Sequence, residues 1–120
     1  MGALVLAAEV LAVGVAGGIG SVLRLIFSRW SGYLPWGILL ANSVASLVAG
    51  FLVWVLPNPI ASLVVITGLL GGLSTFSSWA AATAEYWMAK QRLRMVLNWG
   101  FNLVIPMLSA MLGVAVGTLL

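Results

Sequence analysis

The sequence has no cysteine, no histidine and very few charged residues. Without cysteine there is no disulfide framework and no thiolate metal site. Without histidine the commonest acid–base group and metal ligand is missing. Charged residues make up 6% of the 120 residues, whereas a soluble domain normally has about a quarter. So few charges exclude a soluble enzyme, because the folded chain could not cover its surface with groups that water accepts.

The charges that are present are scattered. The five cations and two anions are Arg24, Arg29, Lys90, Arg92, Arg94, Glu9 and Glu85. Because these cations form no basic patch, nucleic-acid binding is also excluded. Hydrophobic residues make up 63% of the chain. The composition therefore predicts an integral membrane protein.

Four apolar stretches divide the chain. A helix that spans a bilayer needs about 20 mostly apolar residues. Such stretches run over 3–27, 36–56, 60–88 and 95–120. Short connections separate them, and one of these is Pro57-Asn58-Pro59, which cannot continue a helix. The sequence predicts an all-α membrane protein with one domain, residues 1–120, built from four transmembrane helices.

The cations predict how these helices are oriented. All five lie in or beside the first and third connections, and none lies near the termini or in the connection at 57–59. Under the positive-inside rule, the two basic connections are cytoplasmic and both termini face outward. We expect a multi-pass protein of the cell inner (plasma) membrane.

Small residues recur at a spacing of four. The pairs and triplets are Gly14 and Gly18, Gly68 and Gly72, Gly113 and Gly117, and Ala41, Ala45 and Ala49. Such patterns let helix backbones approach closely in lipid. They either pack the four helices of one subunit or also pack one subunit against another. Because they occur on every helix, and because four short helices are too thin to enclose a pore, we expect an oligomer.

The third apolar stretch contains an unusual polar segment. Gly71 and Gly72 are followed by four hydroxyl residues within 74–78. This pattern predicts an unwound turn near 71–75, whose freed carbonyls would be good ligands for a hard cation. The alternative is an unbroken helix in which the hydroxyls bond back to carbonyls of their own helix.

Other polar side chains lie within the apolar stretches. Asn42 offers N–H donors that suit a small anion, or else it forms an interhelical hydrogen bond. Asn98, Asn102 and Ser109 follow steps of four and seven, which place them on one helix face.

The charges inside the helices also admit two interpretations. Arg24 either extends its side chain to the membrane interface or attracts anions into a vestibule. Glu9 is either an interfacial residue or the coupling carboxylate of a transporter. Glu85 and the cations at 90–94 are typical of a helix end at the interface.

These motifs, in this order, resemble the Fluc/CrcB family of fluoride channels. The first is a glycine-rich stretch that leads to an arginine, Gly17-Gly18-Ile-Gly20-Ser-Val-Leu-Arg24. The second runs from Gly37 to Asn42 and on to Ser46 and Gly50. The third and most specific is Gly71-Gly72-Leu-Ser74-Thr75-Phe76-Ser77-Ser78-Trp79, and the fourth comprises Ile105, Ser109 and Gly113.

The resemblance implies an antiparallel dimer with narrow polar pores that let fluoride leave the cytoplasm down its gradient and so protect against fluoride toxicity. It implies a pore lined by Asn42, Phe76, Ser77, Trp79 and Ser109. It also implies a structural Na+ at the dimer interface, held by the carbonyls of Gly71 and Ser74, and a vestibule that contains Arg24.

Two positions depart from the family pattern. Trp79 stands where the family has a second phenylalanine, and Ile105 stands where it has a tyrosine. Tryptophan still offers a positive ring edge and an N–H donor, but isoleucine offers no donor. Because the subunits share the pore walls, we expect one of the two possible pores to be impaired.

The cation bias bears on the partner. A dimer of inverted subunits from one gene needs both orientations to insert, and a five-to-zero distribution of cations should fix one orientation. We therefore favour a heterodimer with a homologous four-helix subunit over a dual-topology homodimer. The alternative functions are a small proton-coupled multidrug exporter of the four-helix type, which would use Glu9, and a structural subunit of a larger complex.

Overall fold

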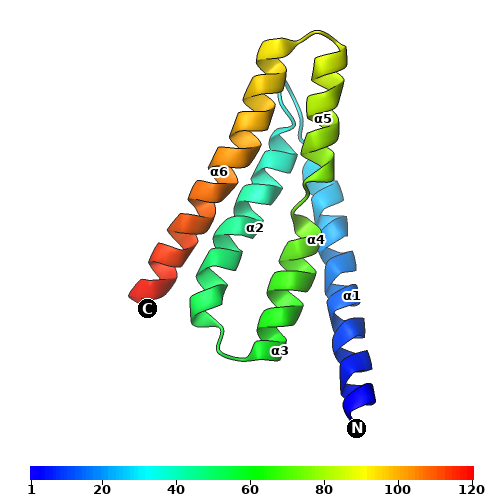
Figure 1. Cartoon of the computed structure of the whole chain (residues 1–120), viewed down its shortest axis with the longest axis vertical. Coiled ribbons are helices and arrows are strands. Elements are labelled where there is room, and N and C mark those ends of the chain that lie inside the picture. Colours follow the sequence, from blue (N-terminus) through cyan, green and yellow to red (C-terminus); the bar gives the residue numbers. More distant parts are fainter.

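The computed structural model describes all 120 residues and contains helices but no strands (Figure 1). In chain order the elements are α1 (Gly2–Ser28), α2 (Trp36–Val55), α3 (Pro59–Ser62), the π-helix η1 (Leu63–Leu70), α4 (Gly71–Leu73), α5 (Ser77–Met88) and α6 (Arg92–Leu119). Elements α3 to α5 together form one segment, so four segments are long and apolar enough to cross a membrane. The prediction of an all-α chain with four spans is confirmed.

The helix bounds agree with the predicted stretches to within a few residues, and the largest difference is at the last helix. We expected this helix to begin at 95, but α6 begins at Arg92. Two arginines therefore lie in its first turn and not in the connection. Arginine is a good helix former, and its long side chain can reach the membrane interface from within a helix.

The segments pack as two pairs joined side by side (Figure 1). Helix α2 lies along α6, and α1 packs against η1 and α4, while α5 contacts α6. Both termini lie at the same end as the turn between α2 and α3, and the two connections that carry cations lie at the opposite end. This arrangement places both basic connections at one end of the molecule.

Two glycine contacts explain how closely these pairs pack. A Cβ added at Gly113 of α6 would meet the carbonyl of Leu47 on α2, and one added at Gly72 would meet the backbone of Gly17 on α1. These two small-residue patterns therefore pack helices within the subunit. Gly14 is different, because apart from its own helix backbone no atom lies within 4 Å of the Cβ position that a larger residue would occupy.

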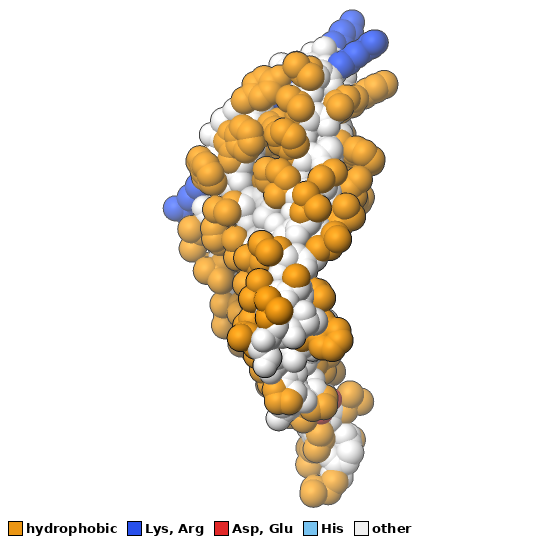
Figure 2. All heavy atoms as spheres, turned by 90° about the vertical axis from the view of Figure 1, so that its left-hand side faces the viewer, with side chains coloured by type: hydrophobic (Ala, Val, Ile, Leu, Met, Phe, Trp, Pro, Cys, Tyr) orange, Lys and Arg blue, Asp and Glu red, His pale blue; other side chains and the backbone are white.

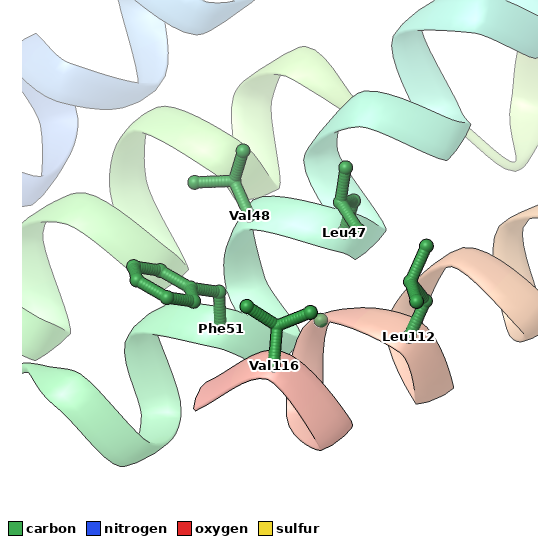
Figure 3. A pocket seen from close by; sticks show the side chains of 6 residues that line it. Leu47, Val48, Phe51, Leu112 and Val116 are labelled. Atoms are coloured by element: carbon green, nitrogen blue, oxygen red, sulfur yellow. The ribbon is translucent and has the colours of Figure 1, made fainter. Parts of the chain in front are cut away.

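Large apolar side chains cover the face shown in Figure 2, and lysine and arginine side chains lie at its top and, separately, on its left edge. So much exposed apolar surface needs lipid or another protein to cover it. Between α2 and α6 this surface is hollowed into a groove of about 340 Å³ (Figure 3). The groove is lined by Leu47, Val48, Phe51, Leu112, Gly113 and Val116.

Candidate functional site: a polar cavity beside an irregular segment

Residues 74–76 interrupt the regular helical structure of the third span. Helix α4 ends at Leu73, α5 begins at Ser77, and Ser74 has extended backbone with φ −77° and ψ 153°. The glycine pair before it is helical, and Gly71 has φ −62° and ψ −38°. The unwinding that we expected from 71 onward therefore does not include the glycines. It lies among the hydroxyl residues, where a side chain from another helix binds the backbone.

That side chain is Asn42 of α2, which forms two hydrogen bonds with the backbone of Thr75. The Thr75 N–H donates to Asn42 Oδ1 at 2.6 Å, and Asn42 Nδ2 donates to the Thr75 carbonyl at 3.0 Å. Both residues are buried. The carboxamide replaces the partners that a continuous helix would have given Thr75, as buried backbone groups require.

Asn42 also belongs to a longer chain of buried carboxamides. Its Nδ2 donates to Oδ1 of Asn102 at 3.3 Å, and Asn102 Nδ2 donates to Oδ1 of Asn98 at 3.1 Å. Asn98 is 0% exposed and donates to the Trp79 carbonyl and to the Thr83 hydroxyl. The chain joins α2, α6 and α5 through the side chains of three asparagines, and its last member bonds to both a carbonyl and a hydroxyl of α5.

A pocket of about 190 Å³, wide open at the surface of the subunit and called the cavity below, lies beside this chain. Its lining comes from α2, the irregular segment, α5 and α6, and comprises Asn42, Ser46, Ser74, Thr75, Phe76, Trp79, Asn102 and Pro106. No charged residue is among them. The cavity is therefore lined by amide and hydroxyl groups, aromatic rings and a proline.

Two aromatic rings line the cavity, one exposed and one buried. Phe76 is 71% exposed, whereas Trp79 is 8% exposed. Their ring centroids lie 4.9 Å apart at an interplanar angle of 81°, which is an edge-to-face contact. The indole is thus part of the subunit interior, and the phenyl ring projects from the subunit.

Two predicted pore residues do not line this cavity. Ser77 is exposed, and its hydroxyl lies 3.3 Å from the hydroxyl of Thr75. Ser109 donates to the Ile105 carbonyl of its own helix at 2.8 Å. Ser109 follows Asn102 by seven residues, so it lies on the same face of α6 but about 10 Å further along.

The predicted vestibule and sodium residues lie elsewhere. Arg24 is half-buried in the last two turns of α1. The Gly71 carbonyl accepts a 3.4 Å hydrogen bond from the Ser74 hydroxyl, which is a long contact. The extended backbone of Ser74 takes its own carbonyl out of the helical direction.

The two connections that carry cations are joined by Arg94. Its guanidinium donates to the carbonyls of Gly32 and Tyr33 and to Oε1 of Gln91. It also lies 5.2 Å from the ring centroid of Tyr33 and 4.4 Å from that of Tyr86. Arg94 therefore fastens the first connection to the ends of α5 and α6.

Residues 11–114 match the family described as "CrcB-like protein, Camphor Resistance (CrcB)". The chain belongs to the CrcB family. A relative from Sulfurovum sp. (strain NBC37-1) is 34% identical over 86% of this chain and 88% of that protein. A relative from Xylella fastidiosa (strain M23) is 35% identical over 98% of this chain and 92% of that protein. A third, from Clostridium novyi (strain NT), is 30% identical over 88% of this chain and 90% of that protein. All three are named "Fluoride-specific ion channel FluC". The family resemblance inferred from the motifs is confirmed.

Sequence reasoning missed part of the cavity of this CrcB chain. Ser46, Thr75 and Pro106 line it and were not among the predicted site residues, and Asn102 had been placed only on a polar helix face. A signal for α6 was present, because 98, 102 and 106 follow one another at steps of four. Pro106 has no N–H to donate to the Asn102 carbonyl. That carbonyl therefore lacks its usual partner within the helix and adds to the polarity of this face.

Proposed function

We propose that this chain is a subunit of a fluoride-selective channel that lets fluoride leave the cytoplasm passively. Its membership of the CrcB family and the names of its relatives support this function. The observation that carries it is the uncharged polar cavity beside Asn42 and the irregular segment 74–76. Such a cavity inside an apolar span has a cost in lipid, which argues for a function.

The lining suits fluoride for a physical reason. Fluoride is small and strongly hydrated, so a pore must replace its water with several weak donors in turn and still release it. The amide of Asn42, the hydroxyls of Ser46 and Ser74, and the ring edges of Phe76 and Trp79 are donors of this kind. A cation in the lining would hold the ion too strongly, and none lines the cavity.

We place the fluoride path along Asn42, Phe76 and Trp79. Ser77 and Ser109 remain proposed members of a polar track beyond the cavity, since both carry hydroxyls outside its lining. Arg24 remains a proposed vestibule residue, because its position near the basic end of α1 lets it attract an anion toward the path.

The path needs a second subunit. Phe76 projects from the surface, and the subunit measures 19 Å in its shortest dimension. We propose an antiparallel dimer in which the partner completes the wall. The five-to-zero bias of cations favours a heterodimer with a homologous subunit over a dual-topology homodimer, with basic connections in the cytoplasm and both termini outside.

A structural Na+ at the dimer interface completes the proposal. The residues fit such an ion, because the extended backbone of Ser74 takes its carbonyl out of the helical direction and Gly71 contributes another carbonyl nearby. Carbonyl oxygens are the ligands that hard cations prefer. A bound Na+ would offset the mutual repulsion of the carbonyls that two subunits bring together.

Fluoride efflux from liposomes tests the proposed function. Purified protein is reconstituted into liposomes that are loaded with fluoride and potassium. The ionophore valinomycin lets potassium leave and so balances the charge of the departing fluoride. A fluoride electrode then follows the release. We expect fast release of fluoride, with chloride retained. Expression of the chain alone and with a homologous partner tests the heterodimer, because release from the purified chain alone would refute it.

A further inference from the structure

The three buried asparagines form a chain in which every carboxamide donates in the same direction. Asn42 donates to Asn102, Asn102 donates to Asn98, and Asn98 donates to α5. Asn102 Nδ2 also donates to the backbone carbonyl of Asn98 at 3.1 Å. Hydrogen bonds aligned in this way polarise and strengthen one another in a medium of low dielectric.

The far end of the chain is held firmly. Asn98 is 0% exposed, and its Nδ2 lies 3.1 Å from the Trp79 carbonyl and 2.9 Å from the Thr83 hydroxyl. That hydroxyl in turn donates to the Trp79 carbonyl at 2.7 Å. The Nδ2 group of Asn102 is therefore held by two hydrogen bonds to Asn98. This leaves the Oδ1 atom of Asn102 directed at Asn42.

The near end of the chain is the weaker one. Asn42 uses one N–H on the Thr75 carbonyl at 3.0 Å and the other on Asn102 Oδ1 at 3.3 Å. The second is the longest bond of the chain, and both of its partners line the cavity. Both N–H groups of Asn42 thus have acceptors within the protein. An anion that enters the cavity must compete for one of them, and the bond to Asn102 is the one that opens most easily.

We infer that Asn102 is a positioning residue whose Oδ1 holds one N–H of Asn42 until fluoride takes its place. This inference rests on the proposed function. The exchange keeps the Asn42 donor satisfied both before and after the ion passes. It also limits how tightly fluoride is held, because Asn102 competes with the ion for the same N–H. Conduction requires binding of this moderate strength.

The substitution Asn102→Leu tests the inference in single-channel recordings. With leucine, one Asn42 N–H has no partner except fluoride, so the ion should bind more tightly and leave more slowly. A hydrogen bond to a charged group corresponds to about a tenfold or greater change in affinity. We expect the unitary fluoride current to saturate at an about tenfold lower fluoride concentration and to reach a lower maximum.

A matched control lies on the same helix. Thr118 of α6 forms a hydrogen bond to Ala115 within its own helix and lies outside the cavity, so Thr118→Val should keep the wild-type current. If Asn102 were merely structural, Asn102→Leu would give fewer active channels, each with the wild-type current and concentration dependence. That result would overturn the inference.

A measurement on the unaltered protein covers the case in which Asn102→Leu does not fold. The side-chain amides of asparagine are labelled with ¹⁵N, and sodium fluoride is added in place of sodium chloride. We expect the Asn42 and Asn102 signals to shift with the same midpoint. A shift of Asn42 alone, or of neither, in protein that conducts fluoride would contradict the inference. Loss of fluoride conduction in the wild type would instead contradict the proposed function.

Discussion

Replacement of Asn42 by leucine should destabilise the fold by removing the clamp on segment 74–76. Leucine has a similar volume but neither donates nor accepts a hydrogen bond. The Thr75 N–H, which lies 2.6 Å from Asn42 Oδ1, would lose its partner, and so would the Thr75 carbonyl. Because Thr75 is 7% exposed, water cannot readily replace the lost bonds.

These two groups set a lower bound on the effect, because the buried Asn102 Oδ1 loses its 3.3 Å bond from Asn42 as well. A buried polar group that loses its partner costs about 1–3 kcal/mol, so the pair gives a loss of about 2–6 kcal/mol in the free energy of unfolding. Interhelical hydrogen bonds measured in membrane proteins average about 0.6 kcal/mol, which favours the lower end of this range. We therefore expect a loss of about 2–3 kcal/mol.

Unfolding by sodium dodecyl sulfate in mixed micelles, followed by far-ultraviolet circular dichroism, measures this loss. Ser43→Ala is the matched control, since Ser43 is the next residue on α2 and its hydroxyl bonds only to the Leu39 carbonyl of its own helix. The control should change stability by less than about 1 kcal/mol. Equal stability of the two variants would refute the idea that Asn42 holds the irregular segment.

Two further substitutions test the packing and the end of the bundle. Gly113→Ala should lower stability by about 1–3 kcal/mol, because the new Cβ would meet the Leu47 carbonyl, whereas Gly100→Ala on the same helix has open space and should not destabilise. The same unfolding assay measures both, and equal stabilities would contradict the close contact of α2 with α6. Arg94→Lys should lose about 1–2 kcal/mol, since an ammonium cannot reproduce the three-acceptor fork and the two ring contacts of the guanidinium. A lysine variant as stable as the wild type would show that charge alone fastens the two connections.

The sequence allowed the four spans to be predicted because hydropathy over about 20 residues is a strong signal that does not depend on distant contacts. The role of Asn42 was harder to predict. Its N–H groups were correctly seen as donors, but their partners, Thr75 and Asn102, lie 33 and 60 residues away in the chain. No local pattern encodes such a pairing, so the choice between an anion ligand and an interhelical bond stayed open.

The last helix shows a similar limit. The period of 3.6 residues placed Asn98, Asn102 and Ser109 on one face, and the structure brings the first two into one hydrogen-bonded chain. The period does not say how far along that face a cavity extends. Pro106 lines the cavity and Ser109 does not, because the extent of the cavity depends on where α5 and the irregular segment end. The position of the irregular turn has a similar cause. The hydrogen bond between Asn42 and Thr75 keeps the backbone at Thr75 out of a helix, whereas the glycine pair does not unwind the chain, so Gly71 is helical.

The reversal potential of the current across a planar bilayer shows directly whether the protein is a passive fluoride channel. A bilayer that contains the protein and its proposed partner subunit separates two solutions that differ in fluoride concentration at equal pH, and then two that differ in pH at equal fluoride. A passive fluoride channel predicts a reversal potential that moves by about 59 mV for each tenfold fluoride ratio and does not respond to pH. A reversal potential that follows the proton gradient, or no fluoride current at all, would contradict a passive fluoride channel.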